Sequence, residues 1–120
     1  MPKAPPTLKN RRDFLACARA HRWVAPGLIL QGRARRSGEA EGLRVGYTCS
    51  KKVGNAVARN RAKRRLRAAA AEVLSEKGRT DWDYVLIGKS GKTAVRPFPS
   101  LLDDLKLALD KIHRPRKSSI

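Results

Sequence analysis

Several stretches of the chain carry the hydrophobic pattern of β-strands. In residues 43–49, apolar side chains occupy every second position, which is typical of a strand with one buried face. Residues 83–89 are almost continuously apolar between turn residues, which predicts a strand covered on both faces. A third strand is expected over residues 28–36, and residues 93–96 give a weaker signal for a fourth. The polar stretch 37–42, which contains two glycines, predicts a turn.

Apolar residues at helical spacing predict three helices. The first is expected over residues 11–20, with Asn10 as its N-cap and Asp13 in its first turn. The second is expected over residues 56–75 and the third over residues 100–112. The side chains expected on the buried faces are, helix by helix, Phe14, Cys17 and Ala18; Ala62, Leu66, Ala69 and Val73; and Leu101, Leu102, Leu105, Leu109 and Ile112.

Turn and cap residues support these boundaries. Gly54 allows a turn before the middle helix, and Asn55 can cap it. Asp103 and Asp104 are expected in the first turn of the last helix, where the helix dipole favours acids. The order of elements is α-β-β-α-β-(β)-α without an internal repeat, which predicts an α/β fold.

Length and charge point to one small, strongly basic domain. The 120 residues leave room for a single domain. The 28 Lys and Arg residues against 10 Asp and Glu give a formal net charge of +18, which favours binding to a polyanion. We expect a disordered basic N-terminus over residues 1–8, one domain over residues 9–113 and a basic tail over residues 114–120.

The sequence excludes several classes of protein. It has no apolar run of about 18 residues that could span a membrane, and its start lacks the apolar segment of a secretory signal. Cys17 and Cys49 form no CxxC motif, and with His21 and His113 they do not match the spacing of a zinc site. We therefore expect a reduced, cytoplasmic chain that binds no metal and buries both cysteines as small apolar residues.

The sequence offers no convincing catalytic group. Asp81 and Asp83 flank a tryptophan at the start of a strand, and Asp103 and Asp104 are helix-cap residues. Neither pair resembles an acid–base dyad. The chain also contains neither of the glycine-rich motifs that bind phosphate in nucleotide-binding enzymes. The sequence therefore predicts binding rather than catalysis.

Positive charge is concentrated in one segment. No acidic residue occurs between Glu41 and Glu72, and residues 51–67 hold eight basic side chains. On a helical wheel, these side chains surround the first half of the middle helix on nearly every side, which suits contact with several phosphate strands. A solvated basic helix without a partner is the alternative that charge alone leaves open.

RNA is favoured over DNA as the partner. The chain shows neither a helix-turn-helix pattern nor a heptad repeat, so it has no obvious element for reading a major groove. Arginine-rich helices suit folded RNA, in which phosphates crowd together from several directions. Phe14 is a candidate platform for stacking a base of a single strand, and ordinary core packing is the alternative for this side chain.

The segment from Ser50 to Arg67, SKKVGNAVARNRAKRRLR, closely resembles the signature of the bacterial ribonuclease P protein subunit. The triplet RNR at residues 59–61 is its central element, preceded by KKVG and followed by KRR. Three flanking segments also resemble this family: LKNRRDF at residues 8–14, LRVGYT at residues 43–48 and DYVLIGK at residues 83–89. The resemblance covers about residues 8–112.

This resemblance implies a small two-layer α/β sandwich, similar to a domain of ribosomal protein S5. A four-stranded sheet would pack with three helices and contain a left-handed βαβ crossover. The implied partners are ribonuclease P RNA and precursor tRNA, with no DNA and no membrane. In that family the RNA subunit, with Mg²⁺, hydrolyses the bond to the 5′ leader. The chain would thus be the accessory protein of an endoribonuclease, contributing no catalytic group, and Mg²⁺ would be bound mainly by RNA.

By matching position, the resemblance also implies site residues. The residues implied to bind the RNA subunit are Lys51, Lys52, Arg59, Asn60, Arg61, Lys63, Arg64, Arg65 and Arg67. The residues implied to form a cleft for the single-stranded leader are Phe14, Gln31, Arg33 and Ser50. Ala18 and Gln31 stand where the family often has aromatic residues, so this cleft would stack fewer bases and depend more on charge.

Two functions follow from these observations. The first is the protein subunit of ribonuclease P, which would screen the repulsion between two RNAs and thereby raise substrate affinity and lower the demand for Mg²⁺. The alternative is a non-catalytic RNA-packing protein of the ribosomal type that uses the same basic helix.

Overall fold

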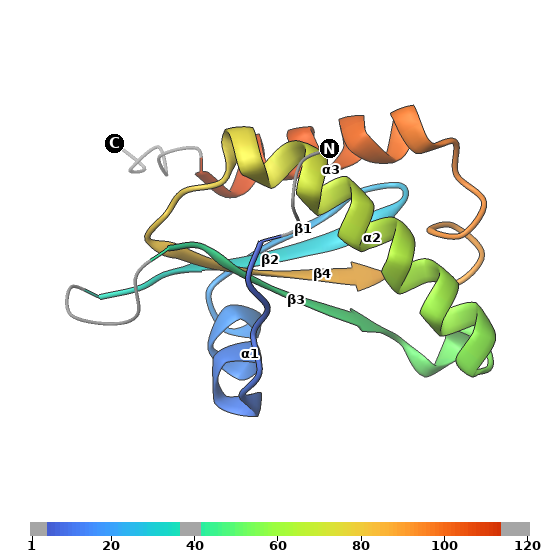
Figure 1. Ribbon diagram of the computed structural model, residues 1–120, viewed down its shortest axis with the longest axis horizontal. Coiled ribbons are helices and arrows are strands. Elements are labelled where there is room, and N and C mark those ends of the chain that lie inside the picture. The colour runs from blue at the N-terminus through green and yellow to red at the C-terminus, as the bar shows by residue number, and fades with distance from the viewer. Residues whose placement is uncertain (1–4, 37–41, 114–120) are drawn as a thin grey trace, which may run out of the picture.

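The computed structural model describes residues 5–36 and 42–113, which form three helices and one four-stranded sheet (Figure 1). In chain order, the elements are α1 (Arg11–Ala18), β1 (His21–Val24), β2 (Leu28–Ala34), β3 (Arg44–Cys49), a 3₁₀ turn (Lys51–Val53), α2 (Ala56–Lys77), β4 (Trp82–Gly88) and α3 (Phe98–His113). The three predicted helices and three of the predicted strands are confirmed, each to within two residues at either end.

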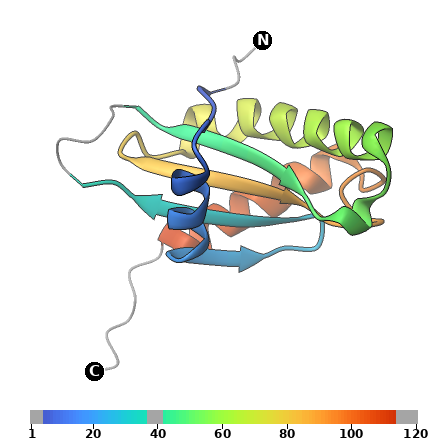
Figure 2. The same cartoon turned by 90° about the horizontal axis from the view of Figure 1, so that it is seen from below.

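The sheet has the strand order β1-β2-β4-β3. β2 pairs antiparallel with β1 and with β4, whereas β3 pairs in parallel with β4. α2 joins the parallel pair, and Figures 1 and 2 together show that this crossover is left-handed. Seen with α2 in front of the sheet and the two strands pointing up, β4 lies to the left of β3. Almost all βαβ units have the opposite hand, so this feature confirms the fold that the resemblance implied.

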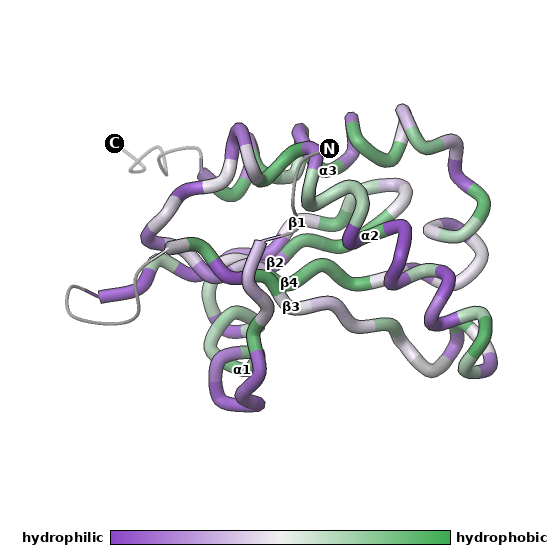
Figure 3. Tube along the Cα trace, in the orientation of Figure 1, coloured by the Kyte–Doolittle hydropathy of each residue, from purple (hydrophilic) through white to green (hydrophobic). Residues whose placement is uncertain are grey.

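The two faces of the sheet are covered unequally. α2 and α3 lie side by side on one face, and α1 lies across the other (Figure 2). The main core fills the space between the sheet and the two long helices. The apolar stripe predicted for the middle helix is buried at every position: Ala62, Leu66, Ala69 and Val73. In Figure 3, hydrophobic colour marks the middle of the sheet at β2 and β4, whereas α1 and the first half of α2 carry both hydrophilic and hydrophobic segments.

The fourth strand is not the one that the sequence favoured. Residues 93–96 form turns, in which the N–H of Arg96 donates to the carbonyl of Lys92 at 2.9 Å. The fourth strand is β1, which forms a hairpin with β2 at the edge of the sheet. Its Trp23 packs against the main core, but Val24 is exposed, so its apolar alternation is short. Pairing with β2, rather than its own hydrophobic pattern, makes this segment a strand.

The N-terminal segment is more ordered than the sequence suggested. The N–H of Leu8 donates to the carbonyl of Val45 at 3.0 Å, and the N–H of Val45 donates to the carbonyl of Pro6 at 2.8 Å. Residues 6–8 are therefore extended rather than disordered, because Leu8 is buried against the second, smaller core. Residues 1–4, most of the predicted turn at 37–42 and the tail 114–120 lie outside the described residues.

Two helix starts differ from the predicted caps. Asn10 precedes α1, but its side chain makes no capping hydrogen bond. α3 begins at Phe98, so its first turn contains no acid. Asp104 is instead buried, accepts a hydrogen bond from the N–H of Gly27 at 3.0 Å and pairs with Arg96. A specific set of buried partners, rather than the helix dipole, therefore accounts for this acid.

Candidate nucleic-acid interface

The first half of α2 begins at a well-specified turn. Gly54 has a φ of +131°, which residues with a side chain rarely adopt. The side chain of Asn55 accepts a hydrogen bond from the N–H of Ala58 at 3.0 Å, which confirms the predicted cap. Together these residues determine the direction in which the basic helix leaves the edge of the sheet.

Most of the polar side chains on this half of the helix face solvent. The exposed ones are Asn60, Arg61, Arg64 and Arg67. Arg59 and Lys63 are half-buried. Within the described residues, none of the cations in residues 59–67 forms an ion pair with a carboxylate. An open groove on the helix surface is lined by Val57, Asn60, Lys63, Arg64 and Arg67. The geometry thus provides a concave cationic surface that can accept phosphate groups.

The surface is extended at both of its ends. Lys52, in the 3₁₀ turn before α2, is exposed; the backbone of Lys51 lies in the same turn, and its side chain is outside the described residues. At the other end, the guanidinium carbon of Arg67 lies 5.3 Å from the centre of the Tyr47 ring. This cation–π contact orients Arg67 while leaving it accessible.

Arg65 departs from this pattern. Its Nε donates to the carbonyl of Thr93 at 2.9 Å, and its Nη2 donates to the carbonyl of Arg96. Its guanidinium carbon also lies 5.9 Å from the centre of the Phe98 ring. Arg65 is therefore bound to the loop between β4 and α3 through two of its guanidinium nitrogens, and the RNA contact that the resemblance implied for it stays a prediction.

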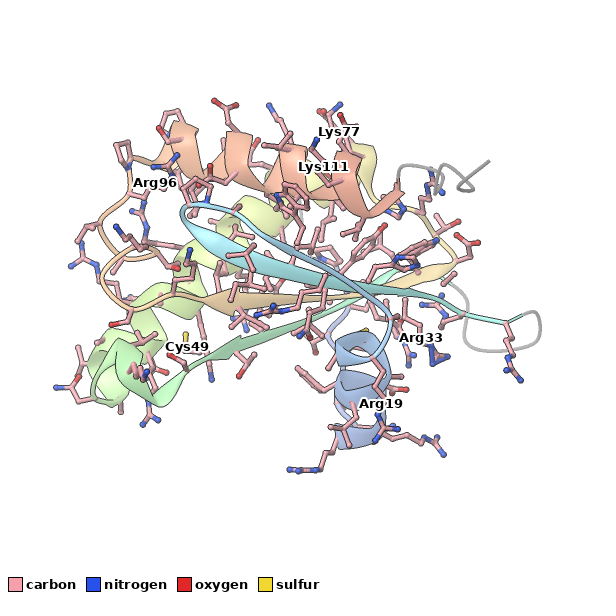
Figure 4. The ribbon with its side chains drawn as sticks, turned by 180° about the vertical axis from the view of Figure 1, so that it is seen from behind. Arg19, Arg33, Cys49, Lys77, Arg96 and Lys111 are labelled. Atoms are coloured by element: carbon pink, nitrogen blue, oxygen red, sulfur yellow. The ribbon has the colours of Figure 1, made fainter. Side chains whose placement is uncertain are left out.

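Three of the four residues implied for the leader cleft share the face of the sheet that carries α1. Gln31 and Arg33 alternate with the buried residues of β2 and so lie on that face, where Figure 4 shows Arg33 beside α1. Phe14 is half-buried, and its ring packs against Gly46 so closely that no Cβ would fit there. Part of the Phe14 ring is therefore used in core packing, and the rest is accessible. Ala18, expected on the buried face of α1, is exposed.

Ser50 lies apart from these residues. It is exposed and directly follows β3. At the rise of a β-strand, the four steps along the chain from Gly46, on which Phe14 packs, to Ser50 span about 13 Å. The predicted cleft residues therefore mark an extended face rather than one pocket.

A buried ion cluster that the sequence analysis missed supports this face. Asp83 of β4 is fully buried and accepts hydrogen bonds from Arg44 at 2.9 Å and 2.8 Å and from Arg35 at 2.5 Å. Arg44 also lies 3.8 Å from Asp13 of α1. A buried charge needs an opposite charge beside it. Asp83 has two such partners, Arg44 of β3 and Arg35 directly after β2, and is not half of a dyad with Asp81. Its signal in the sequence was a lone acid at the start of an apolar strand.

The cysteines and His113 are not suited to catalysis near neutral pH. Burial raises the pKa of the Cys17 thiol to about 12, and burial also raises the pKa of Cys49, which is only half-buried. Burial, together with the nearby Arg79 and His21, lowers the pKa of His113 to about 4. Both thiols therefore stay protonated at neutral pH, and the imidazole of His113 stays uncharged.

Two kinds of feature are absent from residues 5–36 and 42–113. They contain no group of three or more His, Cys, Asp or Glu side chains that could hold a metal ion. No helix there is long and apolar enough to cross a membrane. Asp83 and Asp104, the two most deeply buried acids, each pair with an arginine.

Comparison with known proteins gives a consistent result. The sequence profile of the family described as Ribonuclease P matches residues 2–113. The ribonuclease P protein component of Ruegeria pomeroyi is 63% identical over 109 residues, which cover 91% of this chain and 87% of that protein. The component from Paramagnetospirillum magneticum is 50% identical, with 92% and 85% covered.

Solved structures agree with this match. The ribonuclease P protein from Thermotoga maritima superposes with a TM-score of 0.71 at 21% identity, covering 88% of this chain and 96% of that one. The protein from Staphylococcus aureus superposes with a TM-score of 0.69 at 21% identity, with 89% and 94% covered. At this identity the superpositions establish the fold, while the sequence matches establish the relationship.

Proposed function

This chain belongs to the ribonuclease P protein family, and from that premise we propose that it binds ribonuclease P RNA through the first half of α2. We further propose that the sheet face carrying α1 binds the 5′ leader of precursor tRNA. The observation that carries the proposal is the exposed cationic surface of residues 59–67, whose charges pair with no carboxylate in the described part of the chain. Such charges are free to engage phosphates.

The side chains of this surface suit a folded RNA. Arg61 and Arg64 can each present two N–H groups to one phosphate, and the exposed amide of Asn60 on the same half of the helix adds a donor and an acceptor. A protein with a net charge of +18 also screens the repulsion between two bound RNAs. We expect this screening to raise affinity for the precursor and to lower the Mg²⁺ concentration that cleavage requires.

The leader face suits a flexible single strand. Phe14 presents the part of its ring that is not packed on Gly46, and Gln31 offers amide hydrogen bonds. Ala18 is exposed and small, so the leader gains no second stacked ring one turn further along α1. Binding of the leader would therefore depend on charge and hydrogen bonds more than on stacking.

Hydrolysis of the bond between leader and tRNA is assigned in this proposal to the RNA subunit, with Mg²⁺ held mainly by RNA. The chemistry of the protein supports the assignment. A thiol at Cys17 with a pKa of about 12 is not a nucleophile at neutral pH, and Asp83 is locked between two arginines. The contribution of the chain is to bind and orient RNA.

Reconstitution tests the proposal. Ribonuclease P RNA is mixed with a leader-bearing tRNA precursor at low Mg²⁺, with and without the full chain, and leader release is followed over time. We expect the chain to accelerate cleavage, and an Arg61→Gln/Arg64→Gln variant to lose most of that effect. If the chain binds the RNA but never stimulates cleavage, the RNA-packing alternative gains support. Cleavage by the chain without RNA would contradict the proposal.

Phe14 provides a test specific to the leader. Phe14→Ala should weaken binding of precursor tRNA to the reconstituted complex more than binding of mature tRNA, which lacks the leader. Leu15→Ala, at an exposed neighbouring position on α1, is the matched control. Equal losses for both tRNAs, or a large loss of thermal stability, would favour pure core packing for Phe14.

A further inference from the structure

One cation of the basic helix is directed at the protein instead of at solvent. Arg65 bridges two backbone carbonyls of the loop between β4 and α3, those of Thr93 and Arg96. The planar guanidinium group carries several N–H donors and can bond two separated acceptors at once. A lysine ammonium is a compact point charge and is less suited to bridge them. The ring of Phe98 lies beside the same guanidinium. Arg65 thus ties the loop to the middle of α2.

The loop is held at two further points. The hydroxyl of Thr93, a fully buried residue, donates to the carbonyl of Gly27 at 2.6 Å. The hydroxyl of Ser90 donates to the carbonyl of Lys52 at 2.8 Å. The loop therefore lies directly beside the turn that starts α2, and Figures 1 and 2 both show the two segments together at one end of the molecule.

This end of the molecule is built from segments without acids. Residues 14–38, 42–71 and 84–102 contain no Asp or Glu, and they supply the β1–β2 turn, the start of α2 and the loop. Asp104, which reaches this end from α3, is neutralised by Arg96. Figure 4 shows Arg96 on the loop, at the opposite end of the molecule from Arg19 and Arg33.

Among the described side chains, two lysines are exposed on these acid-free segments. Lys92 projects from the loop, and Lys52 from the turn before α2. The Ser90–Lys52 hydrogen bond joins the two segments, so their charges continue the cationic surface of α2 around the edge of the sheet. An RNA backbone bound to the exposed arginines of α2 and continuing toward the loop would therefore contact these two lysines.

We propose that the loop of residues 89–96 is a second phosphate-contact surface for the RNA bound on α2. Lys92 is its contact residue, Lys52 in the turn before α2 connects the loop to the basic helix, and Arg65 is the positioning residue that holds the loop in place. The inference rests on the proposed function and adds to it a surface outside the basic helix. It also gives a role to Arg65, the cation of residues 59–67 that bonds to the loop.

The contact surface is tested by the salt dependence of RNA binding. The affinity of the full chain for ribonuclease P RNA is measured from low to moderate salt for the wild type, Lys52→Gln and Lys92→Gln. Each lost phosphate contact lowers the steepness of log affinity against log salt by about 0.7–0.9. We expect this decrease for both variants and none for Lys106→Gln, an exposed lysine of α3 that serves as the control.

The positioning role is tested by a double-mutant comparison. Arg65→Lys keeps the charge but loses the bridge between the two carbonyls, and Arg64→Lys is the matched exposed control. We expect Arg65→Lys to reduce the salt dependence about as much as Lys92→Gln does. Lys92→Gln should then have little further effect in the Arg65→Lys background and its full effect in the Arg64→Lys background. Trypsin should also cut after Lys92 faster in free Arg65→Lys protein.

The outcomes separate this inference from the proposed function. If wild-type protein ignores the RNA, the proposed function fails. If Arg64→Gln weakens binding while Lys92→Gln binds like the wild type, the loop surface is wrong and the proposed function stands. Fully additive effects of Arg65→Lys and Lys92→Gln would exclude the positioning role. Should Arg65→Lys fail to fold, Ser90→Ala, which removes the bond to the Lys52 carbonyl, takes its place in the comparison.

Discussion

The two halves of α2 belong to one continuous helix but face different surroundings. In residues 68–77 the helix buries Ala69, Ala70, Val73 and Leu74 against the sheet and α3. In residues 56–67 it buries Ala62 and Leu66 and is otherwise covered mainly with exposed or half-buried polar and basic side chains. The second half is an anchor, and the first half presents charge.

This difference places stability and binding in separate parts of one element. Like charges three and four residues apart, as at Arg61, Arg64 and Arg65, destabilise a helix by a few tenths of a kcal/mol per pair. The buried stripe of the second half offsets that repulsion, so the cationic half stays helical without a partner. Substitutions in the two halves should therefore have different consequences.

The largest effect is expected in the anchor. Leu74→Ala removes a fully buried side chain and should lower the free energy of unfolding by about 2–5 kcal/mol, because it leaves a cavity. Urea denaturation measures this loss. Ser75→Ala, at the adjacent exposed position, is the control and should change stability little. The salt dependence of RNA binding by the folded fraction should stay as in the wild type; a change in it would show that the halves are not separable.

The converse is expected in the charged half. Arg61→Gln/Arg64→Gln removes two exposed cations and should lower the steepness of log affinity against log salt by about 1.4–1.8. Stability should stay within about 0.5 kcal/mol of the wild type. Lys77→Gln/Lys106→Gln removes the same charge from exposed positions beyond the basic half, where Figure 4 shows Lys77. If this control pair weakens RNA binding equally, net charge and not the location of the charge governs binding.

A smaller effect is expected where the charged half begins. Asn55→Ala removes the side-chain cap on the N–H of Ala58 and should cost about 1 kcal/mol of stability. Amide hydrogen exchange at residues 56–58 should become faster. The relative exchange rates of the amides in residues 68–77 should stay as in the wild type. Asn60→Ala, an exposed position inside the helix, should not destabilise the chain. Uniformly faster exchange along all of α2 would contradict the separation of the two halves.

The last comparison concerns pH and the segment that follows the anchor. The N–H of Arg79 donates to the hydroxyl of Tyr84 at 2.9 Å, and that oxygen lies 2.7 Å from Nε2 of His113. Burial lowers the pKa of His113 from 6.5 to about 4. Between these two pH values the unfolded chain holds a proton that the folded chain lacks, so stability decreases as pH falls through this range and is unaffected by this group above it.

Melting temperatures at pH 7 and pH 5 measure this dependence. The difference between the two should shrink in His113→Gln, which cannot titrate, and should persist in His21→Gln, which removes the other imidazole. Contributions from carboxylates are shared by all three proteins and cancel in the comparison. An unchanged difference in His113→Gln would show that His113 is protonated equally in the folded and unfolded chains.

The sequence by itself determined the features that depend on local spacing. The apolar stripe Ala62, Leu66, Ala69 and Val73 lies where helical periodicity put it, and the cap at Asn55 formed as expected. The clustering of cations in residues 51–67 and their exposure on α2 also follow from order and periodicity alone. These features depend on residues within one or a few turns of a helix. They can therefore be predicted without knowing the rest of the fold.

The tertiary structure alone decided which residues meet across the chain. Residues 21–24 became a strand because β2 was available to pair with them, whereas residues 93–96 turned back to bond Gly27 and Arg65. Asp83 is buried because Arg44 and Arg35, 39 and 48 residues away, supply the opposite charge. A helical wheel places Arg65 on a flank of α2 but cannot show that Thr93, 28 residues along, lies beside it. Periodicity determines the direction in which a side chain leaves its helix or strand. Only the packing of the elements determines which residues it contacts there.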